Sequence, residues 1–163
     1  MKDASGKLHC PSRGFVRGWS AEEPLPTIEQ LDYRGVVLPQ IAAPAMLCQC
    51  SRRTLGLPDA YWTPTAQDIA ELEKCLPRYV AEHPPQPDFW QRYKPQEYVR
   101  KYLGVVRADR RRIAVELTYD AKHHVDLAHP SVGPRCDHGP RYFGVEYDLE
   151  DAAFVLIAFD GTG

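Results

Sequence analysis

Residues 142–159 read YFGVEYDLEDAAFVLIAF, and this stretch decides the fold class. Its first half alternates between apolar residues and polar or small ones, which is typical of a strand with one buried face. A short acidic turn at 148–151 leads into a second apolar run, so the stretch predicts an antiparallel β-hairpin. Because burial of one face fixes the register, we expect Val145 to be buried and Glu146, on the opposite face, to be exposed or paired.

A second hairpin is expected upstream of this one. Residues 98–106 and 113–119 both alternate with a period of two, and the residues ADR at 108–110 suit a turn between them. The two hairpins together predict an antiparallel sheet of four or more strands.

One helix is expected before these strands. Thr65 is followed three residues later by Asp68, as in a capping box, and Pro64 suits a first turn. Spacings of three and four then place one apolar stripe on the helix, made of Ile69, Leu72, Leu76, Tyr79 and Val80. The polar face is expected to carry Glu71, Glu73, Lys74 and Arg78. Pro77 is expected to break or kink the helix near residues 74–76, because proline cannot donate a backbone hydrogen bond.

The beginning of the chain lacks such patterns. Residues 1–30 are expected to form an irregular N-terminal arm, followed by a single α+β domain over residues 31–163. The run GVVL at 35–38, followed by Pro39, predicts a short strand at a sheet edge. The predicted fold class is α+β, with one main amphipathic helix packed on the antiparallel sheet.

Composition and charge limit the classes of partner. The chain has 163 residues, of which 44% are hydrophobic and 26% charged, as is usual for one globular domain. A net charge of −2 gives no strong positive field, which argues against nucleic acid and anionic membranes as partners. No apolar run approaches the roughly 20 residues of a membrane helix. No cofactor-binding glycine motif is present, so no cofactor is expected.

The five cysteines are Cys10, Cys48, Cys50, Cys75 and Cys136. An odd number leaves at least one thiol unpaired within a monomer. Cys75 falls on the predicted helix and is expected to be a small buried side chain. We expect reduced cysteines and a cytoplasmic location, because no apolar run follows the charged start of the chain. The alternative is a periplasmic location, if a signal peptide has been removed.

A histidine-rich segment at 123–138 is the main chemical candidate. His123, His129, Cys136 and His138 are the ligand types that zinc prefers, although their spacing matches no established zinc motif. Cys136 could also form a nucleophilic triad with His129 or His138 and Asp126, but such triads depend on spatial geometry. The alternative interpretation is a solvated polar loop.

Arginine and aromatic residues supply candidate binding residues. Arg110, Arg111 and Arg112 lie at the turn of one hairpin, where they could grip phosphates or an acidic protein surface. The aromatic candidates for interface anchors are Trp62, Phe89, Trp90 and Tyr93. The alternative is that these aromatic residues cover the protein's own core.

Four segments together resemble a group of small uncharacterised bacterial proteins: WTPT at 62–65, YLGVV at 102–106, YFGVEYDL at 142–149 and FDG at 159–161. Those proteins have a proline-containing helix, a Y-G-I/V strand and a closing F-G-V-x-Y-D hairpin that ends in F-N-G. The resemblance covers residues 61–163, with Asp160 in place of the usual asparagine. It implies the α+β architecture and a bacterial source, and it transfers no catalytic residue.

The function hypothesis follows from these features. Small proteins of this kind often accompany secreted effectors as immunity or accessory partners, an analogy at the level of fold. We therefore expect a protein-binding module, in the form of a bacterial immunity or inhibitor protein that masks a secreted toxin or effector. The lack of a catalytic motif favours a protein that is not an enzyme. The alternative function is a metal-dependent enzyme that uses the segment 123–138.

Overall fold

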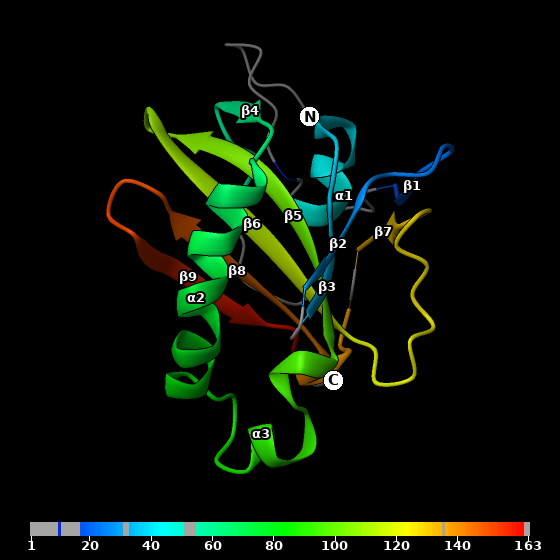
Figure 1. Ribbon diagram of the computed structural model, residues 1–163, viewed down its shortest axis with the longest axis vertical. Helices are drawn as coiled ribbons and strands as arrows, with labels where there is room; N and C mark the ends of the chain where they lie inside the picture. The colour runs from blue at the N-terminus through cyan, green and yellow to red at the C-terminus, as the bar shows by residue number, and fades with distance from the viewer. Residues whose placement is uncertain (1–9, 11–16, 31–32, 51–54, 135, 162–163) are drawn as a thin grey trace.

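The computed structural model describes residues 10, 17–30, 33–50, 55–134 and 136–161, and its mixed α+β fold confirms the predicted fold class. The main sheet has seven strands (Figure 1). Six of them follow the order β2 (Thr27–Gln30), β3 (Tyr33–Val37), β5 (Tyr98–Arg107), β6 (Arg110–Tyr119), β8 (Tyr142–Asp148) and β9 (Ala153–Phe159). The seventh, β4 (Ala60–Trp62), pairs with β5 beyond the end of β3. A second, two-stranded sheet joins β1 (Trp19–Ser20) to β7 (Ser131–Val132).

Both predicted hairpins are confirmed. Strands β5 and β6 pair antiparallel along their whole length, and their turn places Ala108 and Asp109 at φ values of 49° and 61°. Strands β8 and β9 also pair antiparallel, with one irregularity between Glu146 and Tyr147. Val145 is buried as predicted, and Glu146 is paired with an arginine on the opposite face.

Two expectations for the first part of the chain are wrong. The strand expected at an edge is β3, which lies between β2 and β5 and pairs with β5 in parallel. An interior position is compatible with Pro39 because β3 ends at Val37, before the residue that lacks a backbone N–H. Residues 27–30 belong to the sheet as β2 rather than to an irregular arm, because they pair antiparallel with β3.

The main helix, α2 (Ala66–Glu82), begins with the predicted capping box. The Asp68 N–H donates to the Thr65 hydroxyl, and the Thr65 N–H donates to the Asp68 carboxylate. The expected break at Pro77 is wrong, since the helix continues through this residue. Pro77 lies on the exposed side of α2, and its missing N–H leaves the Glu73 carbonyl without its usual helical donor.

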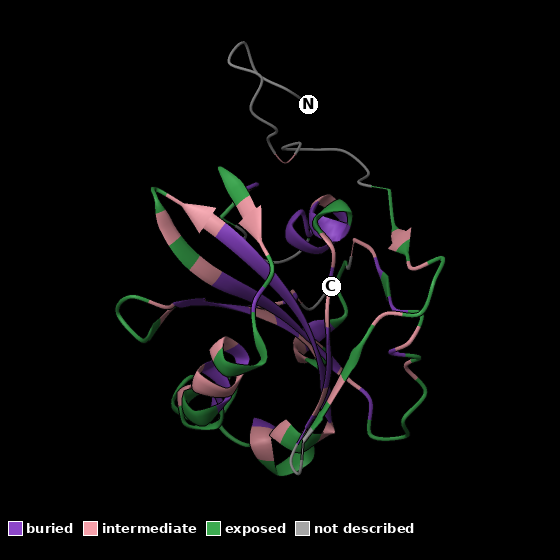
Figure 2. Cartoon of the chain, turned by 45° about the horizontal axis from the view of Figure 1, so that its top comes forward, coloured by how far each residue is buried: buried purple, intermediate pink, exposed green. Residues whose placement is uncertain are grey.

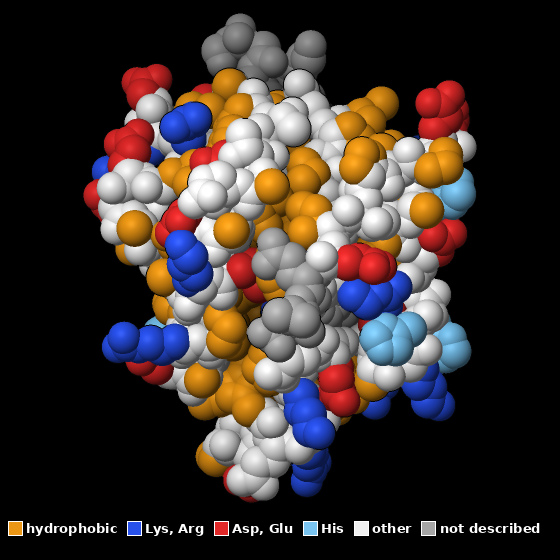
Figure 3. All heavy atoms as spheres, viewed as in Figure 1, with side chains coloured by type: hydrophobic (Ala, Val, Ile, Leu, Met, Phe, Trp, Pro, Cys, Tyr) orange, Lys and Arg blue, Asp and Glu red, His pale blue; other side chains and the backbone are white. Residues whose placement is uncertain are grey.

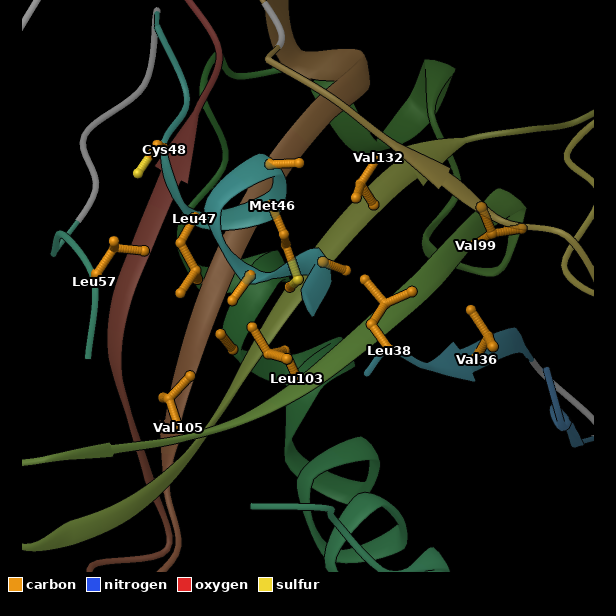
Figure 4. Close-up of a cluster of buried hydrophobic side chains, with 14 of the residues drawn as sticks. Val36, Leu38, Met46, Leu47, Cys48, Leu57, Val99, Leu103, Val105 and Val132 are labelled. Atoms are coloured by element: carbon orange, nitrogen blue, oxygen red, sulfur yellow. The ribbon is translucent and has the colours of Figure 1, made fainter. Parts of the chain in front are cut away.

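Helices cover both faces of the main sheet (Figure 2). On the first, which we call the α2 face, α2 and the short α3 (Phe89–Arg92) pack on aromatic and aliphatic residues of β5, β6 and β8. On the opposite α1 face lie the short helices η1 (Gln40–Ala42) and α1 (Ala43–Leu47). Figure 4 shows Met46 and Leu47 of α1 packed with Leu103 and Val105 of β5 in this second core. Two further short turns, η2 (Pro95–Glu97) and η3 (Gly139–Arg141), lead into β5 and β8.

Two disulfides hold the α1 side together. Cys10 bonds to Cys48 and Cys50 bonds to Cys136, and both pairs have Cα atoms 5.4 Å apart. The expectation of reduced cysteines is therefore wrong for four of the five, because the fold brings residues distant in sequence into bonding distance. Cys75 keeps a free thiol, but it is exposed rather than buried, because it lies beside the apolar stripe of α2 and not on it.

Candidate functional site

Strand β9 forms one end of the main sheet, and no described strand pairs with its outer side. Its sequence, AFVLIAF, contains no charged residue and no proline. Val155 is 44% exposed, and Leu156 and Ile157 are only partly buried. Natural proteins usually protect such edges with charges, proline or a covering segment, because free backbone groups can pair with another chain. We call Ala153–Phe159 and its outer backbone groups the β9 edge.

The register of β8 and β9 indicates which backbone groups point outward. The Asp160 N–H donates to the Tyr142 carbonyl at 3.0 Å, so the backbone groups of Asp160 point toward the chain that continues into β8. In an antiparallel ladder, hydrogen-bonded and non-hydrogen-bonded pairs alternate. Ala158 therefore also faces β8, whereas the N–H and C=O groups of Ile157 and Phe159 point away from it. Residues 156–159 of the β9 edge thus offer donors and acceptors spaced for an added strand, whereas the register shift at Val155 interrupts this spacing.

Apolar surface flanks the β9 edge on both faces of the sheet. On the α2 face, the ring of Phe154 stacks on Tyr79 with centroids 4.3 Å apart. On the α1 face, Leu156 and Ala158 line a hollow of about 40 Å³ together with Leu55 and other residues. Side chains of an added strand would therefore meet apolar neighbours on either face.

The β5–β6 turn holds a network of arginines and carboxylates. Arg107 donates to Glu146 at 2.9 Å, and Arg112 donates to Asp148 at 3.0 Å. Arg110 donates to both oxygens of Asp148, at 2.8 and 2.7 Å. The hydrogen bonds from Arg110 foremost, with those from Arg112 and the backbone of Glu150 and Asp151, lower the pKa of Asp148 to about 2. The carboxylates already satisfy the guanidinium groups of Arg110 and Arg112, which weakens the case for these two as phosphate-binding residues.

The third predicted arginine lies apart from this network. Arg111 is exposed and its guanidinium lies 5.2 Å from the centre of the Trp62 ring. The Trp62 indole N–H donates to the carbonyls of Val105 and Arg112, both at 3.1 Å. Trp62 therefore fixes β4 to the sheet, and only its partly exposed ring remains accessible beside Arg111.

The other aromatic candidates belong largely to the core. Phe89 has no exposed surface, so its assignment as an interface anchor is wrong. Trp90 donates its indole N–H to the Val80 carbonyl at 2.9 Å. Tyr93 packs against Phe89, with centroids 4.9 Å apart, and against Tyr119. These residues pack the end of α2 onto the sheet, which was the alternative interpretation at the sequence level.

The structure does not bring the histidine-rich segment together as a metal site. His129 pairs with Asp126 at 3.2 Å, and His138 contacts the Cys136 carbonyl at 2.7 Å, while His123 contacts Arg34 at 2.8 Å. Cys136 is disulfide-bonded and has no thiolate to offer a metal or a substrate. Within the described part of the chain, no three histidine, cysteine or acidic residues converge on a common point.

Two buried ion pairs were missed in the sequence. Glu73 was assigned to the polar face of α2, but it is buried against the sheet, where it meets Arg100. Its position, four residues after Ile69 and three before Leu76, lies on the apolar stripe and could have revealed this. On the other face of the sheet, Lys101 pairs with Glu116 at 3.0 Å, and both are almost fully buried.

Comparison of the chain with protein-family models, curated proteins and solved structures gave no match. The resemblance to small bacterial proteins therefore stays a prediction. Among the helices of the described residues, none combines the length and apolar character that crossing a bilayer requires.

Proposed function

We propose that this protein is a protein-binding module that takes up an extended segment of another protein as an additional strand at the β9 edge. The observation that carries this proposal is the seven-residue, uncharged outer strand, with Val155 exposed and unprotected by charge or proline. Strand addition of this kind derives affinity from main-chain hydrogen bonds and specificity from alternate side chains.

Charge favours a different protein over a second copy as the partner. The turn before β9 carries Glu150 and Asp151, whose side chains are 58% and 63% exposed. A second copy would bring no lysine or arginine to these carboxylates from β9, because that strand has no charged residue. A segment flanked by basic residues could pair with them across the strands. The expected partner is therefore an apolar extended segment flanked by lysine or arginine.

The two disulfides support an oxidising compartment for this interaction. Disulfides persist in the periplasm and outside the cell, whereas reducing systems keep cytosolic thiols free. Of the two locations considered for the sequence, we propose the periplasmic one. The narrower hypothesis, an immunity protein that masks a secreted toxin, rests on the resemblance and remains a prediction.

The test uses a set of eight-residue peptides that alternate valine and threonine and carry lysine at both ends. We expect saturable binding, accompanied by slower hydrogen exchange of the Ile157 and Phe159 amides. Val155→Lys places a charge on the edge and should weaken binding by about tenfold or more. Ile41→Lys is the matched control, because Ile41 is 72% exposed but belongs to η1, so binding should be unchanged.

Three results would overturn the proposal. If peptides bind while the two β9 amides exchange as fast as before, the binding site lies elsewhere. If β9 amides are already protected in a concentration-dependent dimer without peptide, the edge serves a second copy of this chain. Equal binding by Val155→Lys and the unmodified protein would also contradict the proposal.

A further inference from the structure

A groove of about 480 Å³ lies on the α2 face, where α2, β3, β5 and η2 meet. Its walls include Pro77 of α2 together with Pro95 and Gln96 of η2, and it contains no residue of the β9 edge. Volumes of roughly 300–1,000 Å³ with apolar walls and a few polar groups are typical of small-molecule sites. Figure 3 views the molecule from the side on which α2 lies in front of the sheet, and hydrophobic side chains run down the middle of this side.

Glu73 and Arg100 line the groove. Their side chains are 6% and 3% exposed. Glu73 Oε1 accepts hydrogen bonds from Arg100 Nε at 3.3 Å and from the Tyr102 hydroxyl at 2.7 Å. Arg100 Nη1 donates to the carbonyls of Pro95 and Tyr98, at 3.1 and 2.5 Å. One oxygen of the carboxylate and two nitrogens of the guanidinium, Nε and Nη1, are thus engaged by the protein.

The remaining atoms of this pair have no protein partner among the described residues. Neither Glu73 Oε2 nor Arg100 Nη2 makes a hydrogen bond there, and neither is sealed from solvent. The Tyr33 hydroxyl is buried beside Tyr102 and makes no hydrogen bond of regular geometry. Glu73 Oε2 and Arg100 Nη2 therefore lie open to the groove on side chains that are otherwise almost fully buried, and a polar ligand could pair with both.

The protonation states of Tyr33 and Glu73 determine which of their atoms can donate and which can accept a hydrogen bond. Burial raises the pKa of Tyr33 to about 12, so its hydroxyl keeps its proton at neutral pH. Burial also raises the pKa of Glu73, while Arg100 and Tyr102 oppose that shift. The ion pair is neutral as a unit, and Lys74, which also lines the groove, is paired with Glu71 at 2.7 Å. A free anion in the groove would be repelled by Glu73, and a free cation by Arg100.

We propose that this groove binds a small neutral molecule through a primary carboxamide. The carboxamide oxygen accepts from Arg100 Nη2, and its N–H₂ group donates to Glu73 Oε2. A carboxamide is the simple neutral group that presents an acceptor and donors side by side. The proline rings provide apolar contact for the rest of the molecule.

The test compares three probes of the same shape: benzamide, benzoate and benzamidine. In NMR titrations of the full chain with its disulfides intact, benzamide should shift the Arg100 Nε–H and Gln96 amide signals. Its affinity should exceed that of the two charged probes by about tenfold, because each charged probe leaves one buried group unpaired. Equal affinities, or a preference for either charged probe, would overturn the proposal.

Variants test which residues of the groove determine the order of probe affinities. Glu73→Gln removes the negative charge and presents an N–H₂ group to the groove, so the order of affinity should reverse in favour of benzoate. Tyr33→Phe keeps the ring that lines the groove and removes only a hydroxyl sealed from solvent, so benzamide binding should be unchanged. Cys75→Ser is the control, because Cys75 is exposed on α2 but does not line the groove.

If Glu73→Gln fails to fold, the order of the three probes for the unmodified protein still decides the matter. A loss of benzamide binding in Tyr33→Phe but not in Cys75→Ser would contradict the assigned geometry. Loss of strand binding at the β9 edge would leave these results unchanged, because the two sites share no residue.

Discussion

The two faces of the sheet each hold a buried ion pair, but they enclose it differently. On the α1 face, Lys101 donates to Glu116 and to the Ser131 carbonyl, and both charged side chains are sealed, at 2% and 0% exposed. On the α2 face, Glu73 and Arg100 lie under a regular helix but beside a groove. Neighbouring residues of one strand, Arg100 and Lys101, thus face opposite environments.

The difference separates a structural role from a binding role. Removing two charges from water costs several kcal/mol per ion, and only good pairing offsets this cost. The Lys101–Glu116 pair lies on the face of the sheet that is covered by irregular segments and two disulfides. Its side chains are sealed from solvent, so a ligand has no access to them. The Glu73 pair remains accessible from the groove, so a ligand can complete its hydrogen bonds. We therefore expect substitutions on the α1 face to reduce stability more than those around the groove.

The largest effect is expected at the sealed pair. Lys101→Met leaves the Glu116 carboxylate buried without its cation, which should lower the free energy of unfolding by about 3–5 kcal/mol. Denaturant unfolding measures this loss. The double variant Lys101→Met with Glu116→Leu removes both charges and should recover most of it. A loss below about 1 kcal/mol for the single variant would show that the pair is not sealed as described.

The disulfides of the α1 face are expected to contribute next. Cys50 and Cys136 are 86 residues apart, and a crosslink over such a loop restricts the unfolded chain strongly. Replacing both with serine should cost about 2–4 kcal/mol. Thermal unfolding under oxidising conditions measures the change, and Cys75→Ser serves as the control because that thiol is free. An unchanged melting temperature would mean that this crosslink does not restrain the fold.

Acid sensitivity distinguishes the carboxylates of the two faces. Arg110 holds the pKa of Asp148 at about 2, below its ordinary value of 3.8. The stability from this α1-face group is therefore complete above the ordinary pKa and lost as the pH falls toward 2. The raised pKa of Glu73 has the opposite sign, since protonation of that group favours the folded state.

Asp148→Asn should lower the free energy of unfolding by about 1–2 kcal/mol near neutral pH. It should also flatten the fall in stability between about pH 4 and pH 2. Urea unfolding at a series of pH values measures both effects. If the variant and the unmodified protein lose stability in parallel as the pH falls, Asp148 is not the group responsible.

The sequence predicted the elements that local patterns control. The helix start at Thr65, the two hairpins and the burial of Val145 all follow from spacing within a few residues. The sealed and open ion pairs depend instead on long-range pairing: Lys101 meets Glu116 across a hairpin, and Glu73 meets Arg100 from another element. The disulfides are also long-range, since cysteine positions do not reveal connectivity. The β9 strand itself was predicted, but its position at the end of the sheet was not.

The smallest effect on stability is expected at Tyr33, which lies beside the ion pair of the α2 face. The Tyr33 hydroxyl is buried yet makes no regular hydrogen bond, so Tyr33→Phe removes a group that gains little from folding. The free energy of unfolding should change by less than about 0.5 kcal/mol, or rise slightly, because an unsatisfied polar group is lost. The ring remains to stack on Arg100, whose guanidinium lies 5.0 Å from its centre. Denaturant unfolding beside Lys101→Met provides the measurement. A loss of 2 kcal/mol or more would show that the hydroxyl stabilises the ion pair, which would assign the α2-face pair a structural role like that of Lys101 and Glu116.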